Sequence, residues 1–121
     1  MPKRNPDLLV EDMLDALRKI RLYTEGMSYS SFFQDEKTID AVVRNFEILG
    51  EAARQMPEDF VSGHPDVPWR NIAGLRNRIV HDYFGLDLDI VWQIIQNDLV
   101  PLQTQLKNLQ SPNGFTQLPP A

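Results

Sequence analysis

The sequence predicts an all-α protein, an antiparallel helical bundle of four main helices plus short helical turns. Apolar residues recur every three or four positions through four long segments, and capping residues or prolines mark the ends of those segments. No segment shows the alternation of polar and apolar residues that a half-buried strand requires. With 121 residues the chain suits one domain, which we place at residues 1–110, followed by a Pro-rich flexible tail at residues 111–121.

The first predicted helix follows Asn5-Pro6, an N-capping residue before a proline at the first helical position. Gly26 is the expected stop signal. The apolar stripe of this helix comprises Leu9, Met13, Ala16, Leu17, Ile20 and Tyr23. Residues 28–33 are expected to form a connector or a short helical turn.

The second predicted helix spans residues 35–56 and ends before Pro57, because a proline ring disrupts a continuing helix. Its apolar stripe comprises Ile39, Val42, Val43, Phe46, Leu49 and Ala53. Three prolines and a glycine within residues 57–68 predict a loop.

The third predicted helix begins at Pro68 and reaches about residue 84, just before Gly85. Asp87 is the expected cap of the fourth helix. The apolar residues of that helix follow nearly strict heptad spacing: Leu88, Val91, Ile95, Leu99, Leu102, Leu106 and Leu109. Pro101 falls inside it and predicts a kink. Trp69 and Trp92 lie on apolar stripes and are expected in the core.

Composition narrows the function classes. The chain has no cysteine, which removes disulfides and cysteine catalysis and fits a reducing cytoplasm. No apolar run approaches the roughly 20 residues of a membrane span, so we expect a cytoplasmic protein without a membrane partner. The formal net charge of −5 disfavours nucleic-acid binding through a general basic surface. RNA would need a local patch, for which Arg70, Arg76 and Arg78 are candidates; alternatively, the acidic remainder faces a basic protein.

Residues 76–83 concentrate the chemistry of the chain. The guanidinium of Arg76 stays charged and suits a phosphate, and His81 can exchange a proton near neutral pH. Cleavage of a phosphodiester needs both groups. On a continuous helix Asn77 and His81 share a face, and Arg76 and Tyr83 lie along the neighbouring one, so all four could line one cleft. The alternative is a helix with an ion-paired surface and one half-buried histidine.

The second helix carries a polar stripe of four charged residues, Arg44, Glu47, Glu51 and Arg54. At these spacings the side chains can form weak surface salt bridges. Alternatively the stripe, which Asn45 could join, meets the third helix or a second subunit and orients the active side chains. Small residues beside the apolar stripes predict a face on which two bundles approach closely: Gly50, Ala52, Ala53, Ala73 and Gly74.

A metal site is not expected. The two histidines, His64 and His81, are far apart in sequence, and there is no Glu-x-x-His pair of the kind that binds di-iron in helical bundles. His64 belongs to the predicted loop and is expected to be solvated. No Gly-rich phosphate loop is present, and we expect no cofactor.

The motif Arg76-Asn77-x-x-x-His81-x-Tyr83 resembles the Arg-polar-x-x-x-His motif of the HEPN superfamily. Its terminal tyrosine is similar to that of the HepT-like branch, the toxin half of HepT–MntA toxin–antitoxin pairs in prokaryotes. Residues 10–13, 44–53 and 69–77 also read like that family, so the resemblance covers roughly residues 7–109.

The resemblance implies an all-helical homodimer whose motif helices face each other across a shared cleft, and a metal-independent endoribonuclease. It implies that His81 acts as general base or acid on the ribose 2′-hydroxyl, that Arg76 stabilises the phosphorane-like transition state, and that Asn77 holds the histidine or the phosphate. The products would carry 2′,3′-cyclic phosphate ends. The supporting candidates are Arg78, Arg44, Glu47 and Glu51. The implied partner is an MntA-like nucleotidyltransferase antitoxin, which silences the toxin by attaching AMP to the motif tyrosine, here Tyr83.

Two other classes stay open. The protein could be a non-catalytic helical partner that binds the nucleotidyltransferase and presents a substrate to it. It could also be a helical nucleotide-binding scaffold whose motif holds a ligand phosphate without cleaving it.

Overall fold

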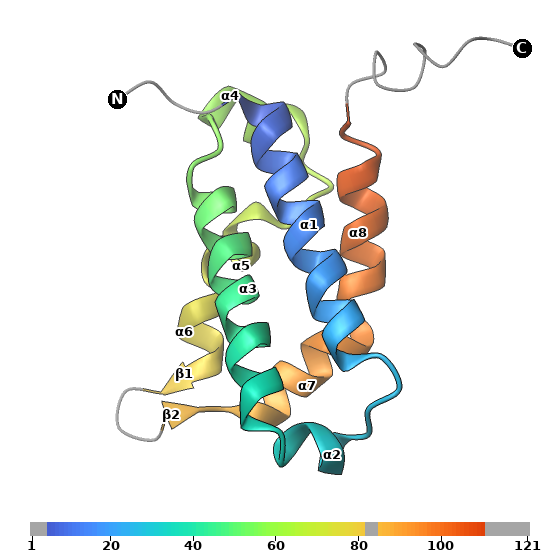
Figure 1. The fold of residues 1–121 in the computed structure, drawn as a ribbon. Helices are drawn as coiled ribbons and strands as arrows, with labels where there is room; N and C mark the ends of the chain where they lie inside the picture. Colours follow the sequence, from blue (N-terminus) through green and yellow to red (C-terminus); the bar gives the residue numbers. More distant parts are fainter. Residues whose placement is uncertain (1–4, 82–84, 111–121) are drawn as a thin grey trace, which may run out of the picture.

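The structure, a computed structural model, describes residues 5–81 and 85–110 (Figure 1). Its elements in chain order are α1 (Pro6–Thr24), α2 (Tyr29–Phe33), α3 (Glu36–Arg54), α4 (Glu58–Gly63), α5 (Trp69–Ala73), α6 (Leu75–Ile79), β1 (Val80–His81), β2 (Gly85–Leu86), α7 (Leu88–Asn97) and α8 (Leu99–Lys107). The long helices α1 and α3 are antiparallel and packed together, α5 and α6 pack on α3, and α8 packs on α1 (Figure 1). The predicted all-α fold class is confirmed.

The predicted ends of the first helix are confirmed. The side chain of Asn5 accepts a hydrogen bond from the Asp7 amide at 2.7 Å, and Pro6 is the first helical residue. Beyond the helix, Gly26 adopts φ +77°, a conformation open mainly to glycine. Residues 28–33 form the short helical turn α2, whose capping box joins Ser28 and Ser31. Of the predicted apolar stripe, Tyr23 is exposed and the other members are buried.

α3 begins where the sequence predicts, because the Asp35 carboxylate accepts from the Thr38 amide at 3.0 Å. The small residues of this helix have a different use from the predicted one. A Cβ on Gly50 would lie 3.1 Å from the carbonyl oxygen of Ile72, so glycine allows α5 to pack closely on α3. Ala52 and Ala53 are buried in the same bundle. These residues serve packing within one chain and do not form an exposed dimer face.

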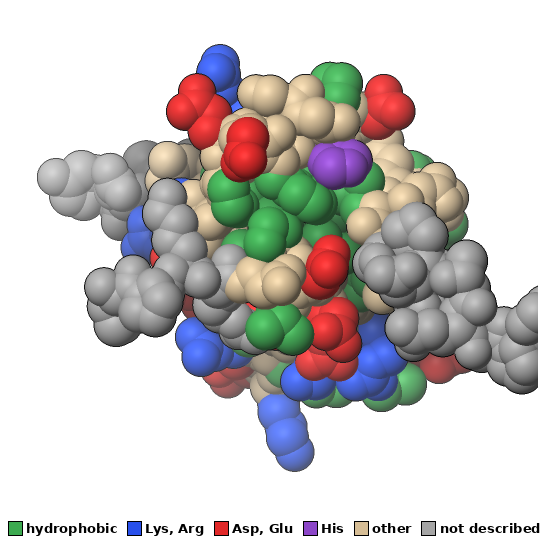
Figure 2. Space-filling model, turned by 90° about the horizontal axis from the view of Figure 1, so that it is seen from above, with side chains coloured by type: hydrophobic (Ala, Val, Ile, Leu, Met, Phe, Trp, Pro, Cys, Tyr) green, Lys and Arg blue, Asp and Glu red, His purple; other side chains and the backbone are tan. Residues whose placement is uncertain are grey.

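The predicted loop at residues 57–68 contains a short helix, α4. His64 ends this helix and is half-buried, in contrast to the predicted solvated side chain: its Nδ1 lies 2.9 Å from the Phe60 carbonyl oxygen, and its ring stacks on Phe60 at 4.3 Å. The Trp69 indole donates to the His64 carbonyl at 3.0 Å. Seen from the α4 end of the bundle, acidic side chains surround an apolar centre (Figure 2).

The predicted third helix does not continue to residue 84. It is divided at Gly74 into α5 and α6, and it ends at Ile79, after which Val80 is extended with φ −114° and ψ 122°. Two adjacent β-branched residues, Ile79 and Val80, favour this change to strand geometry. β1 then pairs with β2 in an antiparallel hairpin, with His81 opposite Gly85.

The predicted kink in the fourth helix is confirmed as a break between α7 and α8 at Asp98. Pro101 explains the position of the break, because its ring would clash with the carbonyl of Asn97 in a continuous helix. The predicted apolar stripe still faces the core in both halves, with Val91, Leu99 and Leu106 almost fully buried.

The core lies between α1, α3 and the two divided helical segments, and it includes Met13, Leu17, Phe46 and Ile79, each at most 1% exposed. Trp69 is buried as predicted, whereas Trp92 is half-buried at the edge of the core. Within residues 5–81 and 85–110, every helix is too short or too polar to span a lipid bilayer.

Candidate functional site

Arg76 is the second residue of α6 and is exposed, as are its neighbours Asn77 and Arg78. The backbone around it is well fixed: the Arg76 carbonyl accepts from the Val80 amide, and the Asn77 and Arg78 amides both donate to the Gly74 carbonyl at 3.1 and 3.3 Å. Arg76 forms no salt bridge with any acid in the described part of the chain. Its guanidinium therefore remains available for an anion from solution.

His81 lies in strand β1, two residues beyond the end of α6. The predicted arrangement, in which Asn77 and His81 share one helix face, is therefore wrong, because no helix connects them. The hairpin that carries the histidine backbone is held by the pairs Val80–Leu86 and His81–Gly85, and Gly85 adopts φ +76°. Tyr83, the predicted modification site, lies outside the described residues.

Asp87 holds this hairpin in place. Its backbone amide donates to the Ile79 carbonyl at 2.7 Å, and its side chain caps α7 by accepting from the Ile90 amide at 3.1 Å. One residue thus joins the end of α6 to the start of α7. The sequence indicates Asp87 as a helix cap, but the bond to Ile79 depends on tertiary structure and has no sequence signal.

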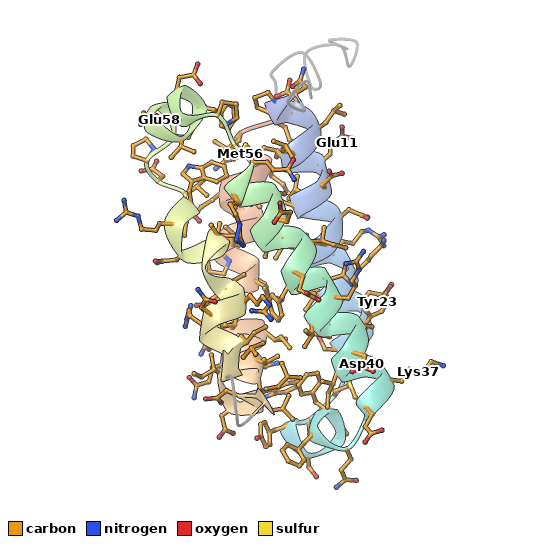
Figure 3. All side chains as sticks on the ribbon, turned by 90° about the vertical axis from the view of Figure 1, so that its left-hand side faces the viewer. Glu11, Tyr23, Lys37, Asp40, Met56 and Glu58 are labelled. Atoms are coloured by element: carbon orange, nitrogen blue, oxygen red, sulfur yellow. The ribbon has the colours of Figure 1, made fainter. Side chains whose placement is uncertain are left out.

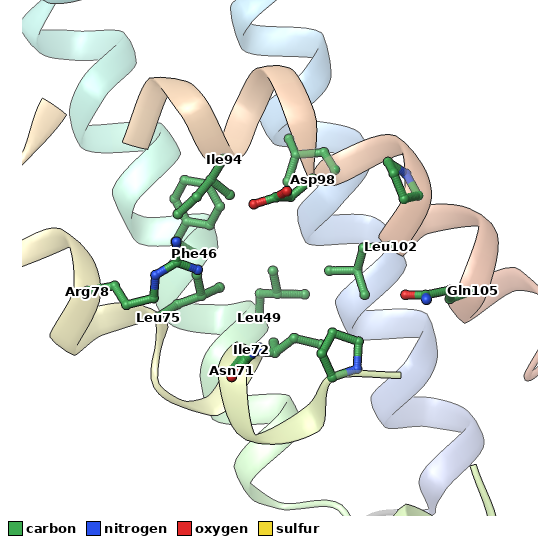
Figure 4. Close-up of a pocket in the computed structure, with 13 residues that line it drawn as sticks. Phe46, Leu49, Asn71, Ile72, Leu75, Arg78, Ile94, Asp98, Leu102 and Gln105 are labelled. Carbon is green, nitrogen blue, oxygen red and sulfur yellow. The ribbon is translucent and has the colours of Figure 1, made fainter. Parts of the chain in front are cut away.

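The arginines of the predicted basic patch face different surroundings. Arg78 extends from α6 over a hollow of about 250 Å³ between α5–α6 and α7–α8, and Asp98 borders the same hollow from the facing helices (Figure 4). The floor of this hollow is apolar and includes Phe46, Leu75 and Ile94. Arg76 is not among its lining residues, since positions two apart on a helix point in different directions.

The polar stripe of α3 divides between two surfaces. Arg44, Glu47 and Glu51 line a groove of about 400 Å³ that α3 forms with α1. Figure 3 shows α1 and α3 on one side of the molecule and α5–α6 on the other. The structure therefore does not bring these three side chains together with Arg76 in one chain.

Arg54 is the stripe residue that reaches the motif side. It donates to the carbonyl oxygen of Ala73, the last residue of α5, at 3.0 Å, and its Nε lies 3.6 Å from a carboxylate oxygen of Glu51. Asn45, which could have joined the stripe, is buried and donates within its own helix to the Ala41 carbonyl.

Two aromatic residues, Tyr29 and Phe33, and two acidic residues, Asp87 and Asp89, lie around strand β2 of the hairpin. The pKa of Tyr29 is raised above its usual value, chiefly by the nearby carboxylate of Asp89. Among the residues that the structure describes, no three His, Cys, Asp or Glu side chains gather closely enough to hold a metal ion.

Comparison with known proteins identifies the family. A model of the family described as Ribonuclease HepT-like matches residues 13–109. A protein of Thermococcus cleftensis named Probable ribonuclease HepT is 35% identical over 108 residues, covering 89% of this chain and 98% of its own. A Methanocaldococcus jannaschii protein provisionally named RNase MJ0127 is 35% identical over 114 residues, covering 91% and 94%. No solved structure gives a significant match.

Family model and relatives agree over nearly the whole described domain, which confirms the predicted resemblance and the predicted class of enzyme, a ribonuclease. The chain belongs to the HepT-like ribonuclease family.

Proposed function

We propose that this protein is a metal-independent endoribonuclease that acts as the cytoplasmic toxin of a toxin–antitoxin pair. Family membership is the observation that carries the proposal, together with an Arg-x-x-x-x-His pair in which the arginine is exposed and forms no salt bridge within the described residues. Metal-independent phosphodiester cleavage requires a cation for the phosphate and a group that can exchange a proton, and Arg76 and His81 are the candidates for these two roles.

In the proposed reaction His81 removes the proton of a ribose 2′-hydroxyl. The 2′-oxygen then attacks the adjacent phosphorus, the bond from phosphorus to the 5′-oxygen breaks, and that oxygen takes up a proton. The products are a 2′,3′-cyclic phosphate and a 5′-hydroxyl. Arg76 stabilises the additional negative charge on the phosphoryl oxygens in the transition state, and Asn77 holds either the phosphate or the histidine.

We propose two kinds of support for these groups. Arg78 borders the hollow on another side of α6 from Arg76 and acts at the dimer contact described below. Glu51 acts at a distance: it pairs with Arg54, and Arg54 holds the carbonyl at the end of α5, directly before α6 begins. Arg44 and Glu47, which lie beside Glu51 in the groove with α1, complete this indirect support.

We further propose a symmetric homodimer that places the two motif segments near the two-fold axis. The hollow beside α6 supports it, because an apolar floor lies between Arg78 on one rim and Asp98 on the other. In an isologous contact each arginine can meet the carboxylate of the second copy. Arg78→Asp should then give a monomer by light scattering, and the charge swap Arg78→Asp/Asp98→Arg should restore the dimer. If the wild-type protein is a monomer at micromolar concentration, the two motif segments do not share a cleft and the proposed dimer is wrong.

The proposed partner is an MntA-like nucleotidyltransferase antitoxin that attaches AMP to Tyr83. An adduct at this position adds negative charge two residues from His81 in sequence. Such a charge competes with an RNA phosphate for Arg76 and repels the remaining phosphates of the substrate.

The deciding experiment compares RNA cleavage by the wild type and by His81→Ala and Arg76→Ala in the presence of a chelator. We expect each variant to lose on the order of 10²- to 10⁴-fold in rate, as is typical when a positioned proton-transfer group is removed. The matched control is Arg18→Ala, which removes an exposed arginine of α1, outside the motif and outside the predicted basic patch. Its cleavage rate should stay near that of the wild type.

Each outcome separates the proposal from its alternatives. Cleavage that persists in His81→Ala, or that stops when a chelator is added, contradicts the assigned mechanism. A wild-type protein that cuts no RNA but still copurifies with a nucleotidyltransferase would instead be the non-catalytic partner.

A further inference from the structure

A second surface adjoins the hairpin that carries His81. It is an open hollow of about 490 Å³ between α2 and the junction of β2 with α7. Its lining residues are Tyr29, Phe33, Gly85, Leu86, Asp87, Leu88 and Asp89. Gly85 is the residue opposite His81 in the hairpin, so this hollow borders the strand pair of the proposed catalytic site.

Two exposed aromatic side chains form one wall of the hollow. Tyr29 is 36% exposed and Phe33 is 54% exposed, and their ring centroids lie 5.8 Å apart. These two rings are not part of the core. The aromatic residue of α2 that fills the core is Phe32, which is fully buried and packs on Trp92 with the ring centroids 5.3 Å apart. Large aromatic surfaces left in contact with water beside an active site commonly indicate a surface that binds a ligand.

The wall is firmly positioned. Tyr29 packs edge-on against Trp92 of α7, with the two ring centroids 6.2 Å apart. Phe33 packs against Tyr29, and more than half of its surface is exposed to solvent. A flat ligand could therefore stack on an aromatic surface whose orientation is already fixed, which lowers the entropy cost of binding.

The charges of the hollow limit which part of a nucleic acid could enter. Asp87 and Asp89 contribute two carboxylates, so a phosphate would be repelled. Nucleobases carry no charge, stack on aromatic rings, and offer N–H groups that a carboxylate can accept. The sugar–phosphate chain would then follow the α6 side of the hairpin, where Arg76 is exposed.

We propose that this hollow binds one unpaired base of the RNA substrate next to the cleaved bond, stacked on Phe33 and Tyr29, with Asp89 accepting an N–H group of the base edge. The inference rests on the proposed ribonuclease function and adds a determinant of substrate choice. The enzyme would cut single-stranded RNA in preference to a duplex, because a paired base cannot enter the hollow.

The test measures RNA binding separately from cleavage. In a His81→Ala background, the affinity for a fluorescein-labelled single-stranded RNA of fixed sequence is measured by fluorescence anisotropy. Phe33→Leu keeps an apolar side chain but removes the stacking surface, and we expect the affinity to fall roughly tenfold. Tyr23→Leu is the matched control, since Tyr23 is 40% exposed and lies on the side of the bundle away from α6 (Figure 3). Its affinity should not change.

A scan with single abasic positions then identifies the bound base. In the His81→Ala protein one position beside the cleavage site should lower affinity when its base is removed, and this effect should disappear in the additional Phe33→Leu variant. Thermal unfolding confirms that Phe33→Leu is folded. Tyr29→Phe keeps the stacking surface and loses the hydroxyl, so it should retain most of the affinity.

The result that overturns the inference is an unchanged affinity in Phe33→Leu, or an equal abasic effect with and without Phe33. If Phe33→Leu leaves RNA affinity intact but abolishes dimerisation or retention of the nucleotidyltransferase, the hollow is a protein interface and the inference is wrong. Because binding is measured without cleavage, failure of the proposed function is distinguishable: a wild type that binds through the hollow but cuts nothing contradicts the function alone.

Discussion

The backbone amide of Asp87 donates to the carbonyl oxygen of Ile79 at 2.7 Å, and this bond joins the end of α6 to the start of α7. Between the two residues lie the hairpin strands and His81. The side chain of Asp87 also caps α7. The position of the histidine backbone relative to Arg76 therefore depends on a short hairpin fixed at its base, and not on the regular spacing of one helix.

Loss of the Asp87 side chain should weaken the attachment of the hairpin to α7. In Asp87→Ala the Ile90 amide loses its acceptor, and the lost N-cap should lower the free energy of unfolding by about 0.5–2 kcal/mol. RNA cleavage should fall as well, because the hairpin would be less firmly held. Asp87→Asn keeps an oxygen acceptor and should stay close to the wild type in urea unfolding. Equal stability of the alanine and wild-type proteins would show that the cap is unimportant.

Position 50 should not accommodate even the methyl side chain of alanine. A Cβ at this position would lie 3.1 Å from the Ile72 carbonyl oxygen, a backbone atom that cannot rotate away. We expect Gly50→Ala to destabilise the protein by about 1 kcal/mol, as overpacking against α5 outweighs the gain in helix propensity. Gly63→Ala is the matched control, because no atom lies within 4 Å of its added Cβ. Chemical denaturation that ranks Gly50→Ala as stable as Gly63→Ala would contradict the close approach of α3 and α5.

Local signals account for the parts of the fold that the sequence predicts well. Asn5 and Asp87 each make the capping bond expected of them, the second long helix begins just after Asp35 as predicted, and Pro101 divides the last helix. Such features depend on a few adjacent residues, so one sequence contains the necessary information.

Features that depend on distant segments could not be predicted in the same way. The end of α6 at Ile79 depends on an amide eight positions along the chain, and the apolar spacing of the segment alone suggested a longer helix. Arg54 binds a carbonyl of α5, whereas its sequence pattern indicated only pairs along its own helix. The proposed roles of Arg76 and His81 come from their chemistry and the family, and stay predictions until variants are assayed.

The stability of the protein should decrease in acid partly through Asp35. Its pKa is lowered because the backbone amide of Thr38, and then the Thr38 hydroxyl, donate to the carboxylate. A lowered folded-state pKa means that the contribution is present above the unfolded value, about 3.9, and is lost as the pH falls through the lower folded value. The stability difference between wild type and Asp35→Asn should thus shrink below about pH 4.

Thr38→Val tests the cause of this pH dependence. It removes the hydroxyl bond of 2.8 Å but leaves the backbone amide in place. The pH dependence assigned to Asp35 should become weaker without disappearing. Urea unfolding measured from neutral pH to about pH 3 decides the matter, and identical pH profiles of wild type and Asp35→Asn would show that another carboxylate is responsible.

Tyr83 provides the test of regulation. If AMP is attached to its hydroxyl, Tyr83→Phe should keep most of the ribonuclease activity and escape silencing when the cognate nucleotidyltransferase is coexpressed. Intact mass should show one adenylyl group on the wild type and none on the variant, and cleavage assays on both proteins should follow that difference. Tyr23→Phe, which alters an exposed tyrosine of α1, is the control and should be modified and silenced like the wild type. Full silencing of Tyr83→Phe, together with an unmodified wild type, would contradict the modification but leave the catalytic roles of Arg76 and His81 intact, because those roles depend on RNA cleavage by the protein without its partner.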